Sequence, residues 1–275
     1  MKIHAIQTGT VAIPPNQLQG KGAGVMRLIH TFTDRRWTEP LPIFAWVLEH
    51  PEGVMLIDTG ETAKASEDGY FPSWHPYFKK VKVWLTPEKE VGPQLQALGI
   101  SPSEVRWVIL THLHTDHAGG LHHFPRAEIL VMRRALELAS GFAGQMRGFL
   151  PQRWPRWFAP KPIDLVPQPF GPFPSSLKLT RAADVVLVPT SGHTQGHVSV
   201  VVQDAELSYF FAGDASYTQQ LMLDQQIDGV ALGEQAARQT LKHIRQFAQT
   251  TPTIYLPSHD PDSAHRLANK NTVAF

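Results

Sequence analysis

Residues 112–117 read His-Leu-His-Thr-Asp-His, which places four side chains with metal-binding atoms in six positions. Imidazole and carboxylate are the ligand types that a borderline cation such as zinc accepts. The segment follows an apolar stretch at 107–110 that is typical of a buried strand. The ligands would then occupy the loop at the carboxyl end of that strand, where open α/β sheets place their chemistry. The spacing therefore predicts a metal centre rather than an ordinary polar loop.

Three later segments repeat the pattern of a short apolar run followed by histidine or aspartate. The residues in these positions are His193 and His197, then Asp214, then His259. Loops at one edge of a sandwich of sheets would bring such side chains together around metal. We therefore expect all four segments to contribute to one site.

Strands and helices alternate in both halves of the chain. We expect strands over 2–7, 42–49, 54–57, 107–110, 127–132, 184–188, 198–203, 207–211 and 253–256. We expect helices over 87–98, 133–139 and 233–249, with a helical turn at 101–104. This order predicts an α/β fold in which two sheets pack face to face beneath outer helices.

Two segments lack this periodicity. Residues 10–40 are rich in glycine, proline and threonine and are expected to form an extended loop. Residues 140–176 interleave prolines with large aromatic side chains, which a disordered linker seldom contains. We interpret this segment as a packed insertion in a single domain spanning 1–275. It would roof a pocket, form a subunit contact, or pack only on its own domain.

Composition excludes several classes of protein. The 275 residues have a net charge of +1, so nothing electrostatic favours nucleic acid or an anionic membrane as a partner. The absence of cysteine excludes disulfides, thiolate metal sites and a cysteine nucleophile. No secretory signal or long apolar span is evident, so we expect a cytoplasmic protein. The aromatic insertion makes a homodimer plausible.

The motifs His-x-His-x-Asp-His, Gly-His-Thr-x-Gly-His, Gly-Asp and Ser-His, in this order, resemble the metallo-β-lactamase superfamily. The upstream Leu-Ile-Asp-Thr-Gly at 56–60 is similar to its second-strand signature. The resemblance implies a four-layer αββα sandwich with two divalent metal ions. The implied ligands are His112, His114 and His193 for the first metal, Asp116, His117 and His259 for the second, and Asp214 as the bridge.

Charge counting favours two ions over one. Five neutral imidazoles, two carboxylates and a bridging hydroxide carry −3 against +4 from two divalent cations. Such a hydroxide would be the nucleophile at neutral pH. We expect zinc, although iron, cobalt and manganese accept the same ligands. We interpret Asp58, a carboxylate that follows a strand, as orienting a ligand histidine or a loop backbone, with a plain turn-forming aspartate as the alternative. The resemblance implies that His197 lies outside the ligand set.

A tyrosine three residues after the bridging aspartate, Tyr217, is similar to the N-acyl homoserine lactone lactonases, which are quorum-quenching enzymes. That resemblance implies that the Tyr217 hydroxyl contacts the lactone carbonyl oxygen and that Asp116 passes a proton to the leaving alkoxide. Thr115 departs from the group, which commonly has an aromatic residue there, and this leaves the acyl-chain preference open.

Other functions fit less well. A flavodiiron-type oxidoreductase has glutamate where His114 stands and needs a flavin module, and a tRNA-processing nuclease needs a basic arm. A structural metal scaffold rarely uses two cations with a bridging carboxylate. The main alternative is the same metal site acting on another lactone, an aryl ester or a phosphotriester.

Overall fold

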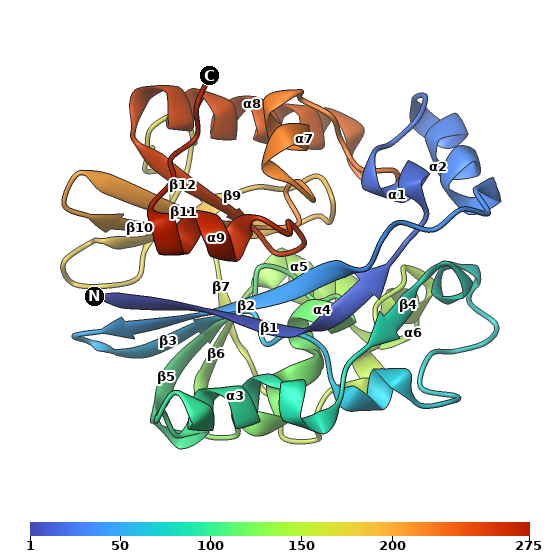
Figure 1. Cartoon of the computed structure of the whole chain (residues 1–275), viewed down its shortest axis with the longest axis horizontal. Coiled ribbons are helices and arrows are strands. Elements are labelled where there is room, and N and C mark those ends of the chain that lie inside the picture. The colour runs from blue at the N-terminus through green and yellow to red at the C-terminus, as the bar shows by residue number, and fades with distance from the viewer. The chain divides into compact units, whose positions relative to one another are not determined.

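The computed structural model describes residues 1–275, which divide into two compact units. Unit 1 comprises residues 1–13 and 37–163, and unit 2 comprises residues 14–36 and 164–275. Unit 1 contains a seven-stranded sheet and unit 2 a five-stranded sheet (Figure 1). The expected clustering of strands into two sheets, one for each half of the chain, is therefore confirmed.

The sheet of unit 1 has the strand order β4-β1-β2-β3-β5-β6-β7. Its strands are β1 (Lys2–Ala12), β2 (Leu41–His50), β3 (Gly53–Ile57), β4 (Lys82–Trp84), β5 (Val105–Ile109), β6 (Glu128–Met132) and β7 (Lys161–Ile163). The pairs β4–β1, β1–β2 and β2–β3 are antiparallel. The pairs β3–β5, β5–β6 and β6–β7 are parallel. The parallel order puts the carboxyl ends of β3 and β5 at one edge, so the residues after each strand are neighbours.

The helices of unit 1 are short. They are α3 (Val91–Ala97), α4 (Thr115–Ala118), α5 (Arg133–Ala139) and α6 (Gly141–Met146), with 3-10 turns η1 (Ala63–Ser66), η2 (Pro76–Lys80), η3 (Pro87–Lys89), η4 (Pro102–Glu104), η5 (Gly119–His123) and η6 (Pro151–Arg153). The predicted helix 87–98 is split at Glu90 into η3 and α3, and Gly92 and Pro93 lie in the first turn of α3. Gly99 ends it in the left-handed region at φ +80°.

The sheet of unit 2 has the order β12-β11-β10-β9-β8. Its strands are β8 (Leu177–Lys178), β9 (Val185–Pro189), β10 (Val198–Asp204), β11 (Leu207–Gly213) and β12 (Thr253–Pro257), and its helices are α1 (Pro15–Leu18), α2 (Gly24–Thr33), α7 (Gln219–Leu223), α8 (Glu234–Thr250) and α9 (Ser263–Asn269). The apolar stripe of α8 is buried as predicted, with Leu241 and Ile244 packed in the same core as Phe210.

The extended loop predicted for residues 10–40 is wrong. β1 continues to Ala12, and the helices α1 and α2 follow. The pattern of α2 misled the prediction because its apolar residues Val25 and Ile29 are exposed, whereas Arg27 is buried. The Arg27 guanidinium donates to the carbonyl oxygens of Asp228 and Ala231. A buried, hydrogen-bonded arginine thus anchors this helix where sequence patterns anticipate an apolar side chain.

The aromatic segment 140–176 contributes to both units. Phe149 is buried in unit 1, and Phe173 is buried in the core of unit 2. Phe142, on α6, is 70% exposed. Packing therefore orders part of the segment, while its role as a pocket roof or a subunit contact stays a prediction. No helix in the structure is long and apolar enough to cross a membrane.

Candidate metal centre

The loop after β5 brings the first group of predicted ligands together. His112 Nε2 lies 2.9 Å from His114 Nδ1, and the ring centroids of His112 and His117 are 4.1 Å apart. The single turn of α4 carries Asp116 and His117 on adjacent positions, with Asp116 Oδ1 3.9 Å from His117 Nε2. His112 and His117 are fully buried. Within unit 1 the motif is thus a compact cluster of nitrogen and oxygen donors.

Asp58 holds this loop from the end of β3. Its carboxylate accepts hydrogen bonds of 2.8 Å from Thr111 N, from Thr111 Oγ1 and from His117 Nδ1. Asp58 adopts the left-handed region at φ +57°, a conformation that is costly outside glycine and that the three bonds stabilise. The hydrogen bond between His117 Nδ1 and Asp58 keeps the proton of His117 on Nδ1. The other ring nitrogen, Nε2, faces Asp116. The contact expected between Asp58 and a ligand histidine is present.

In unit 2, Asp214 lies between two predicted ligands. It follows β11 immediately, and its Oδ2 is 3.5 Å from His193 Nε2 while its Oδ1 is 3.3 Å from His259 Nε2. All three side chains are buried. Because each carboxylate oxygen faces a different imidazole, the geometry suits a carboxylate shared by two cations.

His197, which directly precedes β10, contacts the backbone of Asp214. Its Nδ1 is 2.8 Å from Thr190 Oγ1, and its Nε2 accepts the backbone N–H of Asp214 at 3.1 Å. Both ring nitrogens therefore bind protein groups. This arrangement agrees with the expectation that His197 lies outside the ligand set.

Sequence reasoning missed Asp228. Its Oδ2 lies 3.2 Å from His193 Nδ1, and its Oδ1 accepts the N–H of Val230. Carboxylates commonly hold the outer nitrogen of a metal-ligating histidine in this way. Asp228 follows no strand, and the Asp-Gly pair at 228–229 indicates only a turn. No sequence signal distinguished it.

Glu61 was also missed. It is fully buried, and its Oε1 accepts the N–H of Thr62 at 2.9 Å. Burial, together with the nearby charge of Asp116, raises the pKa of Glu61 to about 8. In the metal-free protein, the raised pKa favours the neutral form of this carboxyl group at neutral pH.

Tyr217 is buried close to the ligands of unit 2. Its hydroxyl accepts a hydrogen bond of 3.2 Å from Gln17 Nε2. Its ring centroid is 6.3 Å from that of His193 and 5.4 Å from that of His259. This is the neighbourhood expected for Tyr217, while its catalytic role stays a prediction.

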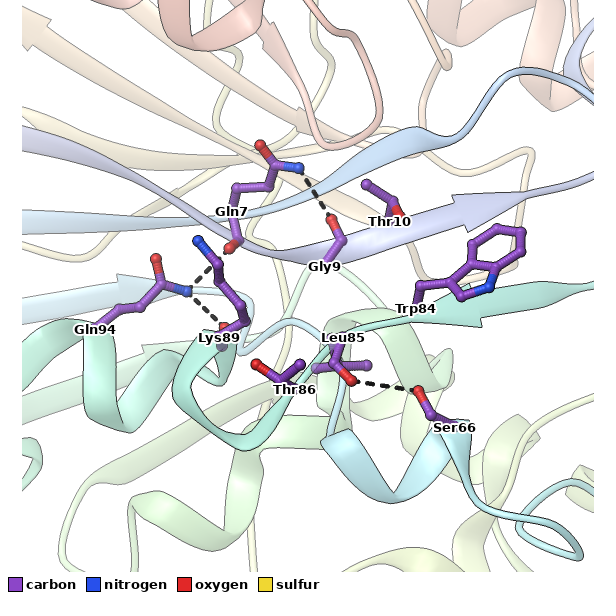
Figure 2. A pocket seen from close by; sticks show the side chains of 9 residues that line it. All are labelled: Gln7, Gly9, Thr10, Ser66, Trp84, Leu85, Thr86, Lys89 and Gln94. Carbon is purple, nitrogen blue, oxygen red and sulfur yellow. Dashed lines mark hydrogen bonds between the residues drawn. The ribbon is translucent and has the colours of Figure 1, made fainter.

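A pocket of about 590 Å³ lies elsewhere in unit 1. Figure 2 shows its lining, in which Gln94 donates to the carbonyl oxygens of Gln7 and Lys89. No imidazole or carboxylate lines it. The pocket therefore lacks metal-binding groups and contains none of the predicted site residues.

The donor groups suit divalent ions in both units. In each unit a buried carboxylate holds the outer nitrogen of a predicted ligand, as Asp58 does for His117 and Asp228 does for His193. A model of the metallo-beta-lactamase superfamily matches residues 38–259. The chain belongs to the metallo-β-lactamase superfamily. Its predicted fold class is thereby confirmed.

The relatives within the superfamily include named lactonases. N-acyl homoserine lactonase AttM of Azorhizobium caulinodans is 26% identical, with 96% of this chain and 94% of that protein covered. An N-acyl homoserine lactonase of Bacillus thuringiensis is 25% identical, with 80% of this chain and 82% of that protein covered. The resemblance to this group is confirmed.

Solved structures support the same fold. An N-acyl homoserine lactone hydrolase, with the product N-hexanoyl-L-homoserine at its catalytic metal centre, has a TM-score of 0.75. It is 21% identical, with 100% of this chain and 97% of that chain covered. AidC, described as a dizinc quorum-quenching lactonase, has a TM-score of 0.64 at 16% identity, with 94% of this chain and 87% of that chain covered.

Proposed function

We propose that this superfamily member is a metal-dependent hydrolase that opens the ring of N-acyl homoserine lactones. Similarity to AttM over nearly the full length of both proteins supports the substrate class. The structural observation behind the metal chemistry is Asp214, whose two oxygens face His193 and His259 separately. The proposed ligands remain the seven residues named from the resemblance.

The metal ions would supply a Lewis acid for the ester carbonyl and an activated water at neutral pH. The protein has to hold its donors in fixed protonation states for this purpose. Asp58 does so for His117 and Asp228 for His193, because each carboxylate accepts the Nδ1 proton of its histidine. His197 Nε2 accepts the backbone N–H of Asp214 and so fixes the backbone at that ligand. The donor set is therefore organised by the protein's own hydrogen bonds.

Two side chains act on the substrate in this proposal. Tyr217 donates its hydroxyl proton in a hydrogen bond to the oxygen that becomes negatively charged when the lactone carbonyl is attacked. Gln17 Nε2 donates a hydrogen bond to the same hydroxyl oxygen and so helps to hold it in place. Asp116 passes a proton to the alkoxide oxygen released when the ring opens. Its side chain is partly exposed, as a group that exchanges protons with solvent and substrate requires.

Zinc is the metal we propose. Five imidazoles and two carboxylates are ligands that zinc accepts readily, and AidC is described as a dizinc enzyme. Elemental analysis of protein purified without added metal tests this identity. Two equivalents of zinc per chain are expected, whereas iron, cobalt or manganese at that stoichiometry would contradict it.

A pH-indicator assay of the purified protein tests the substrate class. The panel contains acyl homoserine lactones of different chain length, δ-lactones, aryl esters and paraoxon. Acid release from the acyl homoserine lactones, lost after chelation and restored by metal, supports the proposal. Hydrolysis of the phosphotriester alone would instead favour the alternative ester substrate.

A further inference from the structure

Glu90, His122 and His123 form a second compact group of potential ligands in unit 1. One donor atom from each residue lies within 4.8 Å of the others. Glu90 Oε2 is 3.0 Å from His122 Nε2 and 2.6 Å from His123 Nε2. We propose that this group binds one divalent transition-metal ion of the zinc class, in addition to the ions of the hydrolytic centre.

The spacing of the three atoms fits a single ion after a small opening. Zinc bonds of about 2.0–2.1 Å separate two ligand atoms of a tetrahedral site by roughly 3.3 Å. To reach that value, the distance from Glu90 Oε2 to His122 Nε2 has to grow by about 0.3 Å and the distance to His123 Nε2 by about 0.7 Å. The His122 side chain is 44% exposed and can supply the smaller movement, and the His123 ring, which is 20% exposed, has to supply the larger one. Solvent on that side provides water as the fourth ligand.

The hydrogen bonds around the group select the atoms that face the ion. Glu90 Oε1 accepts bonds from Thr62 Oγ1 at 2.9 Å and from Ala63 N at 2.7 Å, so Oε2 remains for the two imidazoles. His122 Nδ1 lies 3.3 Å from the carbonyl oxygen of Gly119. A proton held on Nδ1 presents the Nε2 lone pair to the ion. Metal-ligating carboxylates and histidines typically have such outer partners.

The protonation states also suit metal binding. Burial and the neighbouring His122 lower the pKa of His123, which favours the neutral imidazole. Burial by itself raises the pKa of Glu90, but its hydrogen bonds from Ala63, His123 and Thr62 outweigh that effect and lower the pKa. A neutral imidazole and an ionised carboxylate are the forms that bind divalent ions.

An ion at this position would link segments next to the ligand loop. Glu90 contacts the chain at 62–63, just after the Asp58-Thr59-Gly60 turn, while His122 and His123 belong to η5, directly after α4. Gly60 O also accepts the N–H of Gly119 at 2.9 Å. We therefore expect the ion to stabilise unit 1 without taking part in hydrolysis.

Zinc titration of the enzyme already loaded with its two hydrolytic ions tests the inference. Bound zinc is counted by elemental analysis after rapid desalting, and affinity is measured by calorimetry. We expect a third equivalent in the wild-type protein, together with a rise in its unfolding temperature. His122→Ala and Glu90→Gln should each lower the affinity for the third zinc ion by roughly tenfold or more, since each removes a ligand. The glutamine keeps an oxygen for Thr62 and Ala63.

His265→Ala is the matched control because it removes an exposed imidazole from α9. It should retain the third equivalent, and His122→Ala should keep the wild-type rate of lactone hydrolysis. A wild-type protein that stops at two equivalents would overturn the inference. So would a third equivalent that either ligand variant binds as tightly as the wild type. Zinc counting uses no lactone, so failure of the proposed substrate class leaves this result unaffected.

Discussion

The two units hold their predicted ligands by different means. In unit 1 the four ligands lie within six positions of one loop, and Asp58 holds that loop with three bonds of 2.8 Å, two to Thr111 and one to His117. In unit 2 the ligands come from three separate strand ends, and Asp228 contacts His193 through one bond of 3.2 Å. One residue thus holds the contiguous motif of unit 1, whereas in unit 2 separate partners contact separate ligands, Asp228 for His193 and His197 for Asp214. The variants below test this difference.

Loss of Asp214, whose carboxylate lies between His193 and His259, should have the largest effect. Asp214→Ala removes both oxygens that face His193 and His259, so metal binding and lactone hydrolysis should both be abolished. His112→Ala should have the same result in unit 1. Metal content and initial rate are measured on the same preparation. Full activity in a variant free of metal would contradict the mechanism.

Exchange of the two outer carboxylates compares the units directly. Asp58→Asn should lower metal affinity or activity by about 100-fold and Asp228→Asn by about tenfold, within the range known for such partners. The difference is expected because the asparagine at 58 disturbs three bonds and a left-handed backbone, while at 228 it changes one contact to a histidine. Chelator competition measures both affinities. Equal losses of metal affinity in the two variants would show that the number of hydrogen bonds made by the outer carboxylate does not determine its effect.

Tyr217→Phe tests a side chain that acts on the substrate rather than on the ligands. The turnover number should fall about tenfold or more, because a hydrogen bond to the developing oxyanion is lost. Metal content should stay at two, which separates this variant from the carboxylate variants. Steady-state kinetics with an acyl homoserine lactone measures the effect. An unchanged turnover number would remove Tyr217 from the catalytic residues.

Glu61 has no counterpart among the residues of unit 2 described above. Its effect should be the smallest and should appear in the pH dependence of protein stability. Its pKa of about 8 in the folded protein lies above the ordinary value of 4.5. The contribution of Glu61 to the free energy of unfolding is therefore complete below pH 4.5. It is lost as pH rises toward 8, by up to about 1.4 kcal/mol per pH unit. Urea unfolding of the metal-free protein should show this fall, and Glu61→Gln should reduce it.

Glu88→Gln is the control for Glu61, because the hydrogen bond with Thr86 lowers the pKa of that exposed carboxyl group. It should leave the decline of stability between pH 5 and 8 as in the wild type. A decline that persists unchanged in Glu61→Gln would assign the pH dependence to other groups.

Local sequence predicted the elements whose apolar pattern matches their burial. The stripe of α8 and the short valine-rich strands β9 and β10 are of this kind. Helix α2 was missed because Arg27 occupies its buried face, and a buried arginine is recognisable only when its carbonyl partners are known. The short helix α7 offers too few turns for its periodicity to stand out.

The sequence alone determined the chemistry of this protein. Donor types and their spacing in 112–117, followed by His193, Asp214 and His259, indicated metal and the superfamily, because ligand atoms are a property of residue type. The sequence also indicated Asp58 as a residue that orients them, whereas only the tertiary structure revealed several other groups. Asp228, Glu61 and the cluster around Glu90 depend on which loops fold against one another, and such neighbours leave no regular spacing along the chain.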